Sequence, residues 1–149
     1  SHVEHKVERE VPQQAVLKHE RFMACISTNE VIAKKVIRKT ARLANYYHSN
    51  WILLYVQTPS ESFDRIGLAK QRHLINNFKL ATELGARVIR TEGSSVAKTI
   101  VAIAEEQKIT TICIGKPHLN LFRIIIASNV FNELLNKLSS SDIDLILLS

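Results

Sequence analysis

Residues 51–59 read Trp-Ile-Leu-Leu-Tyr-Val-Gln-Thr-Pro, an uninterrupted apolar run that ends in a turn. A short, continuously apolar run of this kind is typical of a strand that is buried on both faces of a sheet. The pair Thr58-Pro59 ends the strand, because proline has no N–H group to donate to a neighbouring strand. A strand covered on both faces needs a helical layer on each side, so this segment predicts an α/β protein.

Strands and helices alternate on both sides of this segment. Four further short runs predict strands, namely Phe22–Ser27, Arg87–Thr91, Thr110–Gly115 and Ile143–Leu148. Apolar residues at helical spacing predict helices over Asn29–His48, over Ser60–Leu84 with an interruption near Gly67, from Ser94 or Ser95 onward, and from about Ser128 to Lys137. This alternation predicts a three-layer α/β sandwich, with a five-stranded parallel sheet and right-handed crossovers. Ligands of such folds bind beyond the carboxyl ends of the strands, where the strand order reverses.

The length of 149 residues suits a single domain, and 46% hydrophobic with 23% charged residues is ordinary for a globular protein. Residues 1–20 alternate in charge and contain Pro12, so we interpret them as a linker or domain edge and residues 21–149 as the domain. No apolar run approaches the roughly 18 residues of a membrane-spanning helix, and the N-terminal residues lack the apolar region of a signal peptide. The sequence therefore predicts a cytosolic protein, or a cytosolic part of a larger one.

The formal net charge of +6 favours anionic partners such as nucleotides, nucleic acid or acidic lipid. Five basic residues lie in the first predicted helix, which we interpret as the solvated face of an amphipathic helix rather than as a nucleic-acid surface: Lys34, Lys35, Arg38, Lys39 and Arg42. No nucleic-acid-binding motif accompanies them. The histidines and the two cysteines lack metal-ligand spacing, so no structural metal is expected.

Four phrases of the chain resemble, in the same order, segments of Kdp-type sensor histidine kinases. They are ILLYVQTP (52–59), LATELGARVIRTEGSSVAKTI (80–100), ICIGKP (112–117) and SSDIDLILLS (140–149). The resemblance runs from about Arg21 to Ser149. It implies a universal-stress-protein-like regulatory domain, whose fold is similar to that of the adenine-nucleotide hydrolases and has strand order 3-2-1-4-5.

The same resemblance implies the setting of the domain. It would be a cytoplasmic domain of an inner-membrane bacterial sensor kinase that controls potassium-transport genes, with the other domains of that kinase as partners. The chain contains neither the phosphorylated-histidine box nor the ATP-binding motifs of a kinase. We therefore expect no catalytic residue in it, and any phosphotransfer would take place elsewhere in the parent protein.

The implied strand order places the reversal between the first and fourth strands, flanked by residues 27–29 and 115–118. It also puts Cys25 and Cys113 near each other in the core, where we expect two buried, reduced thiols. Universal stress proteins that bind ATP carry G-x-x-G, nine residues, then G and S or T. The positions in this chain are Gly115, His118, Ser128 and Asn129, and only the first matches. Those relatives also end the first strand with an aspartate, where this chain has Ser27.

A phosphate-containing ligand such as ATP still suits the residues that surround the predicted crevice. The basic or potentially basic groups are Lys116, His118 and Arg123, and the hydroxyl and amide groups are Ser27, Thr28, Asn29, Ser128 and Asn129. The alternative is that the charges are solvated loop residues and that Ser128 or Asn129 simply caps a helix.

Cyclic di-AMP is a second candidate ligand. Some Kdp kinases bind it through S-x-S after the first strand and F-T-A-x-Y on the second. Ser27 and Tyr55 match those patterns and Trp51 offers a ring in place of phenylalanine, whereas Asn29 replaces a serine and residues 52–53 depart.

Two hypotheses that do not involve a regulatory ligand remain open. In the first, the chain is a dimerisation or domain-interaction module with a degenerate pocket, and the apolar strand Ile143–Leu148 packs across a two-fold axis as in universal stress protein homodimers. In the second, which ranks last, the chain cleaves ATP. It lacks the S-G-G-x-D-S type of loop that this activity requires in related folds.

Overall fold

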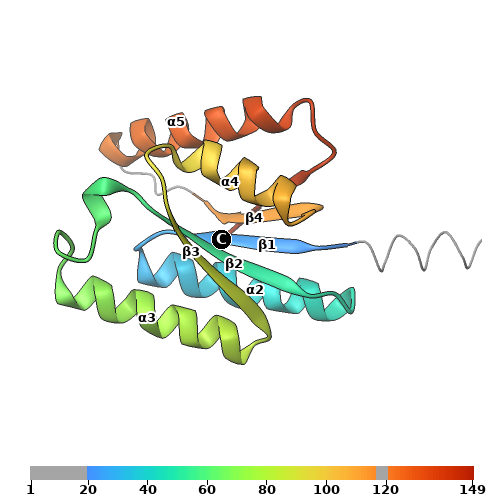
Figure 1. The fold of residues 1–149 in the computed structure, drawn as a ribbon, viewed down its shortest axis with the longest axis horizontal. Coiled ribbons are helices and arrows are strands. Elements are labelled where there is room, and N and C mark those ends of the chain that lie inside the picture. The colour runs from blue at the N-terminus through green and yellow to red at the C-terminus, as the bar shows by residue number, and fades with distance from the viewer. Residues whose placement is uncertain (1–19, 117–120) are drawn as a thin grey trace, which may run out of the picture.

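The computed structural model describes residues 20–116 and 121–149, and gives the backbone alone for residues 121–129. Its five strands form one parallel sheet in the order β3-β2-β1-β4-β5 (Figure 1). The strands are β1 (Phe22–Ile26), β2 (Trp51–Gln57), β3 (Ala86–Glu92), β4 (Thr111–Gly115) and β5 (Asp144–Leu148). The predicted fold class and strand order are therefore confirmed.

Helices cover both faces of the sheet. Helices α2 (Glu30–Tyr46) and α3 (Leu68–Glu83) lie on one face, and α4 (Val96–Glu106) and α5 (Leu121–Leu138) lie on the other (Figure 1). A short 3-10 turn, η1 (Pro59–Glu61), separates β2 from α3.

The helix ends follow the capping residues in the sequence. The Ile32 amide donates to the Asn29 side chain at 3.1 Å, so that Asn29 caps α2, and Ser95 caps α4 in the same manner. Gly67 is the N-cap of α3, as the predicted interruption requires, and Gly85 follows its C-terminus with a positive φ of 96°. The last predicted helix was wrong at its start, because α5 begins at Leu121 rather than at about Ser128.

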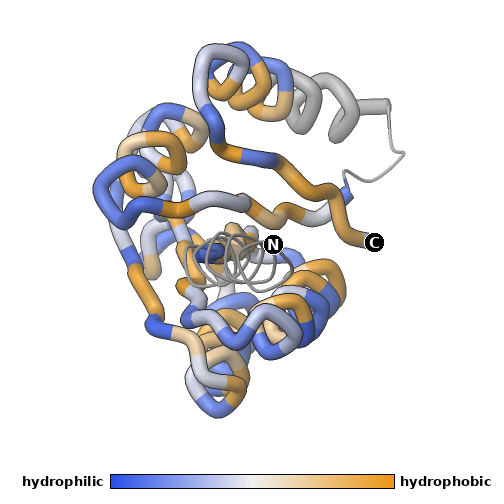
Figure 2. Tube along the Cα trace, turned by 90° about the vertical axis from the view of Figure 1, so that its right-hand side faces the viewer, coloured by the Kyte–Doolittle hydropathy of each residue, from blue (hydrophilic) through white to orange (hydrophobic). Residues whose placement is uncertain are grey.

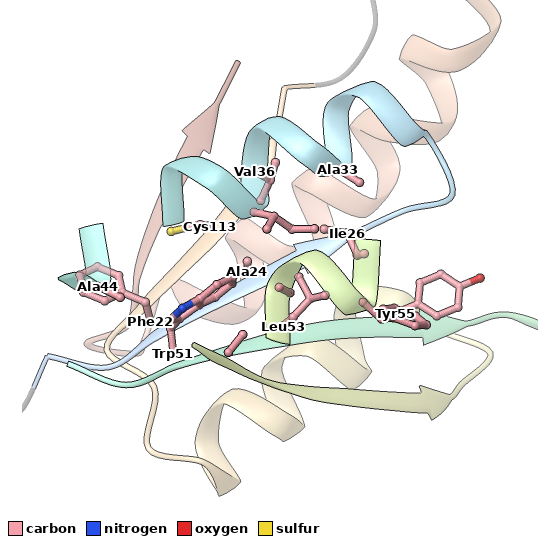
Figure 3. Close-up of a cluster of buried hydrophobic side chains, with 14 of the residues drawn as sticks. Phe22, Ala24, Ile26, Ala33, Val36, Ala44, Trp51, Leu53, Tyr55 and Cys113 are labelled. Carbon is pink, nitrogen blue, oxygen red and sulfur yellow. The ribbon is translucent and has the colours of Figure 1, made fainter. Parts of the chain in front are cut away.

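Strand β2 separates two hydrophobic clusters, as its continuous apolar run predicts. Leu53 belongs to the cluster under α2 and α3, while Leu54 belongs to the cluster under α4 and α5, and both side chains have no exposed surface. Burying a leucine side chain contributes roughly 1.5–3 kcal/mol to folding. The first cluster extends along the strands from Trp51 to Tyr55 (Figure 3), and Figure 2 shows how apolar and polar residues alternate along the covering helices.

Cys25 and Cys113 lie on adjacent strands but belong to different clusters. Cys113 pairs with Ala24, so Cys25 is one position further along β1 and faces the opposite side of the sheet. Burial raises the pKa of Cys113 to about 11, and burial together with the neighbouring Cys113 raises the pKa of Cys25 still further. Both thiols are therefore protonated at neutral pH, and neither has the low pKa of a reactive cysteine.

Candidate functional site

The loops after β1 and β4 meet at the carboxyl edge of the sheet. These strands are neighbours, and Cys25 pairs with Ile114, so residues 27–29 leave the sheet beside Gly115 and Lys116. The Lys116 amide donates to the Leu148 carbonyl at 2.9 Å, which holds the start of its loop against β5. The structure thus brings together five of the residues predicted for the site, which are Ser27, Thr28, Asn29, Gly115 and Lys116.

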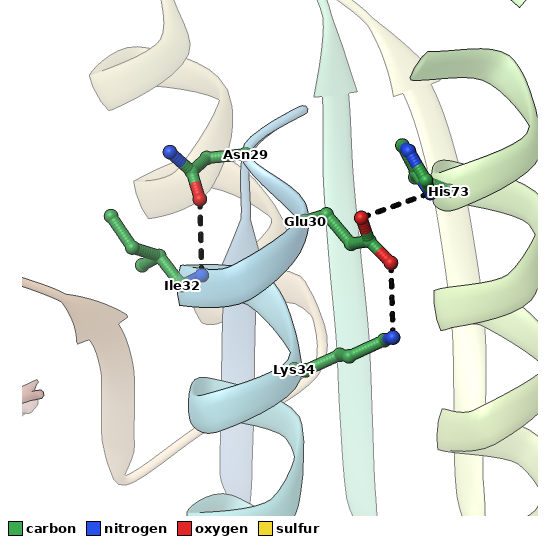
Figure 4. A network of polar contacts seen from close by, with 5 residues as sticks. All are labelled: Asn29, Glu30, Ile32, Lys34 and His73. Carbon is green, nitrogen blue, oxygen red and sulfur yellow. Dashed lines mark hydrogen bonds and ion pairs between the residues drawn. The ribbon is translucent and has the colours of Figure 1, made fainter. Parts of the chain in front are cut away.

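The polar groups directly after β1 serve the start of α2. Asn29 accepts a hydrogen bond from Ile32 as the helix cap, and its own amide donates to Ser27 Oγ at 3.3 Å (Figure 4). Glu30 then accepts from Lys34 Nζ at 3.0 Å and pairs with His73 Nδ1 of α3 at 3.0 Å (Figure 4). The hydrogen bond from Lys34, with the charges of His73 and Lys34, lowers the pKa of Glu30. Much of this edge is therefore engaged within the protein.

A carboxylate does lie beside the loop after β1, although it does not come from that strand. Glu61 of η1 accepts from Thr58 Oγ1 at 3.0 Å and from Thr28 Oγ1 at 3.5 Å. Sequence reasoning missed it, because Glu61 is 33 residues away from Thr28 along the chain and belongs to no motif. Its negative charge disfavours a ligand with several phosphate groups at this position.

Tyr55 reaches the same end of the molecule from β2. The residue is 1% exposed, its ring lies 6.0 Å from the Phe78 ring, and its hydroxyl has no hydrogen-bond partner among the described residues. Burial, followed by the charge of Glu61, raises the pKa of Tyr55 to about 12, although Arg90 acts in the opposite direction. The phenol is therefore a neutral hydroxyl whose hydrogen-bonding capacity is unused.

Arg90 of β3 is a second residue that the sequence did not single out. It pairs with Tyr55 across the sheet, and its guanidinium carbon lies 4.9 Å from the Phe63 ring centroid and 5.1 Å from that of Phe78. Such contacts hold an exposed guanidinium in place without neutralising it. No pattern in the sequence could have found this group, because the rings come from a loop and from a separate helix.

Gly115 is explained by packing. A Cβ atom at this position would lie 2.3 Å from Ile32 Cγ2 and 3.3 Å from Val36 Cγ2, so only glycine lets α2 lie this close to β4. The match of Gly115 to the first glycine of the ATP-binding pattern therefore has a structural reason of its own.

The other predicted phosphate contacts can be placed only in part. His118 lies outside the described residues, and the side chains of Arg123, Ser128 and Asn129 do too. The backbone at Ser128 and Asn129 is inside α5, more than one turn beyond Leu121. The expectation that one of them caps this helix was therefore wrong, because α5 continues for several residues on the N-terminal side of both.

Among residues 20–116 and 121–149, no three His, Cys, Asp or Glu residues are grouped so that they could hold a metal ion. Also within those parts, every helix is too short or too polar to cross a bilayer.

Solved structures with the same fold are universal stress proteins. One from Archaeoglobus fulgidus has a TM-score of 0.64 at 15% identity, over 87% of this chain and 98% of that chain. A universal stress protein of A. fulgidus in complex with dAMP has a TM-score of 0.56 at 15% identity, over 87% of this chain and 98% of that chain. Another, in complex with cAMP, has a TM-score of 0.59 at 14% identity, over 86% and 94%. The architecture and the crossover edge thus define a universal-stress-protein fold.

Sequence relatives narrow this class. The sensor protein KdpD of Clostridium acetobutylicum is 35% identical over 129 residues, which are 85% of this chain and 14% of that protein. KdpD of Escherichia coli K12 is 32% identical over 96 residues, which are 64% of this chain and 10% of that protein. No protein-family model matches the chain. The chain is therefore a universal-stress-protein-like domain that corresponds to one segment of KdpD sensor proteins, as the resemblance of its sequence phrases indicated.

Proposed function

We propose that this chain is the regulatory domain of a sensor histidine kinase, and that it binds a nucleotide-like anion at the carboxyl edge between β1 and β4. The observation that carries the proposal is the meeting of residues 27–29 with Lys116 where the strand order reverses, the usual position of ligands in doubly wound folds. The complexes of similarly folded universal stress proteins with dAMP and cAMP support a nucleotide as the class of ligand.

Four described residues supply the chemistry of this proposed site. The Lys116 side chain is exposed and attracts a phosphate group, and the exposed Ser27 hydroxyl adds a hydrogen-bonding partner. The unpartnered Tyr55 hydroxyl donates to the ligand once the residues that cover it move apart, because this side chain is 1% exposed. The guanidinium of Arg90 adds a positive charge on the β3 side. Contacts from His118, Arg123, Ser128 and Asn129 remain predictions of the sequence.

The charges around the site favour a ligand with few phosphate charges. Glu61 is close to the loop after β1, and only one glycine of the ATP-binding pattern is present. Both features weigh against a triphosphate held as in the ATP-binding universal stress proteins. We therefore place cyclic di-AMP and adenosine monophosphate ahead of ATP.

In this proposal the domain acts on the rest of its parent protein. A ligand changes the kinase only if it binds one state of the parent more tightly than another, because differential affinity is what shifts an equilibrium. The other domains of the kinase are then the partners that respond when the ligand is bound. The response that they control is the expression of potassium-transport genes.

Calorimetric titration with cyclic di-AMP, adenosine monophosphate and ATP, each separately, tests the proposal. We expect saturable binding that Lys116→Ala and Tyr55→Phe each weaken by about tenfold, the effect of losing one hydrogen bond to a charged group. Lys108→Ala is the matched control, because it removes an exposed lysine from the turn at the other edge of the sheet. Absence of heat with all three nucleotides, or equal weakening by the control, would contradict the site.

A homodimer is a second candidate function, favoured by one observation. Strand β5 is an edge of the sheet, and the apolar side chain of Leu147 on it is 39% exposed. Light scattering on the eluting protein tests this directly. A monomer at high concentration, with Leu147→Lys behaving like the wild type, would count against a dimer through this strand.

A further inference from the structure

A cavity of about 380 Å³ lies at the amino edge of the sheet, away from the proposed nucleotide site. Its walls come from the positions just before and at the start of three neighbouring strands, since Phe22, Trp51 and Ala86 are paired across β1, β2 and β3. Trp51 and Tyr55 mark the opposite ends of the core cluster in Figure 3, which separates the two regions along the strands. The volume lies within the roughly 300–1,000 Å³ that small-molecule sites occupy.

The lining of this cavity combines two positive charges with residues of a mainly polar surface. Phe22, Trp51 and Ile109 also line it, but each is less than 5% exposed and offers little surface to a ligand. Arg21 and Arg87 are the charged residues of the lining, and no acidic side chain belongs to it. A polar, positively charged surface of this kind suits a small anion rather than a large apolar ligand.

Arg21 has a buried donor atom without an acceptor. Its Nε atom is buried and has no hydrogen-bond partner among the described residues, and the same is true of Ser49 Oγ, which immediately precedes the lining residue Asn50. A buried donor without an acceptor is costly, and the cost is larger for a charged group. An oxyanion in the cavity would supply that acceptor.

Arg87 is held at the rim with part of its guanidinium available. One of its terminal nitrogens donates to Gln107 Oε1 at the C-cap of α4. A guanidinium has five N–H donors, so this single hydrogen bond leaves others for a ligand. Planar guanidinium groups match the two oxygens of a carboxylate or phosphate.

Two carboxylates close in sequence to the lining, those of Glu20 and Glu106, accept hydrogen bonds from residues outside it. Glu20 accepts from Thr110 Oγ1 at 2.9 Å, and Glu106 accepts from Gln107 Nε2 at 3.5 Å. Neither residue contributes to the wall. The positive charges of the two arginines are therefore not neutralised by a lining residue.

We propose that this cavity is a second ligand site, for a small molecule that carries a phosphate or carboxylate group. Arg21 and Arg87 hold that group. The site is separate from the proposed nucleotide site and does not depend on it. It gives the domain a means of responding to a second anionic compound.

The chain contains a built-in reporter, because Trp51 is its single tryptophan. Phenyl phosphate and benzoate are titrated while the fluorescence of Trp51 is followed, with phenol as the uncharged control and sodium chloride at matched ionic strength. We expect saturable changes with the two anions alone. Arg21→Gln and Arg87→Gln should each weaken binding about tenfold, whereas Lys108→Gln and Lys116→Gln should change it less than twofold.

Amide chemical shifts of the wild-type protein provide a readout that does not depend on the variants folding. Shifts at the Trp51 indole N–H and at the amides of Gly85 and Ile109 support the proposal. Shifts confined to residues 27–29 and 115–116 would overturn it, because the probes would then occupy the carboxyl edge. Equal affinity of the arginine variants and the wild type, or no saturable change with either anion, would overturn it as well.

Discussion

The polar groups at the two edges of the sheet differ in how fully they are hydrogen-bonded within the protein. At the carboxyl edge, Asn29 caps a helix, Glu30 joins α2 to α3, and Glu61 accepts from two threonines. At the amino edge, Arg21 Nε and Ser49 Oγ are buried without partners among the described residues, next to a cavity. Several polar groups at the edge that the sequence motifs indicated are thus hydrogen-bonded within the protein, whereas the edge without a motif has two buried polar atoms without described partners.

Because of this difference, substitutions at the two kinds of polar group should change stability in opposite directions. A group that already has its hydrogen bonds contributes to stability, and its removal destabilises the fold. A buried group without partners lowers stability, and its removal should raise stability while weakening any ligand. At the carboxyl edge, Tyr55 resembles Arg21 and Ser49, because its buried hydroxyl also has no hydrogen-bond partner among the described residues.

Gly115→Ala should have the largest effect, and it tests whether the carboxyl edge is fixed by packing. The new Cβ atom would lie 2.3 Å from Ile32 Cγ2, so α2 must move or the side chain must leave its rotamer. Overpacking of this kind costs about 1–3 kcal/mol, and we expect a loss of about 2 kcal/mol in the free energy of unfolding. Urea denaturation measures it.

Ile32→Ala provides the control for this first prediction. The truncation removes the atom that the new Cβ would meet, so Gly115→Ala should cost less in its presence than in the wild type. Equal costs in both backgrounds would show that Gly115 is not required by its contact with α2. Its role would then have to lie in the loop that follows.

Most helices and strands were predictable because their signals are local, whereas the strand order came from the family resemblance. The run at residues 51–56, the caps Asn29 and Ser95, and the stop at Gly85 each act within a few residues of the chain. The start of α5 was missed although Asn120, a residue type favoured at helix N-caps, directly precedes Leu121 in the sequence.

The site was predictable only where the topology determines it. Strand order places residues 27–29 beside Gly115 and Lys116, as the resemblance implied. The contacts of Glu61 and Arg90 join segments far apart in the chain, and the cavity near Arg21 collects single residues from the starts of several strands. No spacing or motif encodes such groups, because they exist only after the sheet has formed.

Tyr55→Phe should stabilise the protein while weakening its proposed nucleotide ligand. The hydroxyl is buried without a partner, and removing such a group recovers about 1 kcal/mol or somewhat more. Thermal unfolding without ligand measures the gain, and calorimetry with cyclic di-AMP measures the loss of affinity. A destabilised variant would mean that the hydroxyl is already hydrogen-bonded, and that the carboxyl edge has no unused donor there.

Arg21→Met, at the amino edge, should also raise the free energy of unfolding, but by less than Tyr55→Phe does. Methionine keeps much of the apolar stem and removes the unpartnered Nε, but Arg21 is only partly buried, so we expect about 0.5 kcal/mol. Arg65→Met, at an exposed loop position, is the matched control and should change the free energy of unfolding little. If Arg21→Met destabilises the protein without any anion present, the guanidinium serves the fold and the contrast between the two edges fails.

Glu30→Gln should have the smallest effect, visible as a change in pH dependence. The hydrogen bond from Lys34 and the charges of His73 and Lys34 hold the pKa of Glu30 below its ordinary value of 4.5. A carboxyl whose pKa is lower in the folded protein stabilises the fold above pH 4.5, and this contribution is lost as the pH falls through the lowered pKa. The free energies of unfolding of wild type and Glu30→Gln should therefore differ most near pH 7 and converge in acid.

Urea denaturation at several pH values measures the difference, with Glu83→Gln as the control for the loss of one exposed negative charge at the end of α3. If the free energies of unfolding of wild type and Glu30→Gln instead differ by the same amount down to acid pH, the ion pairs of Glu30 do not help to hold α2 against α3. The geometric contacts at the carboxyl edge would then contribute less to stability than their distances indicate.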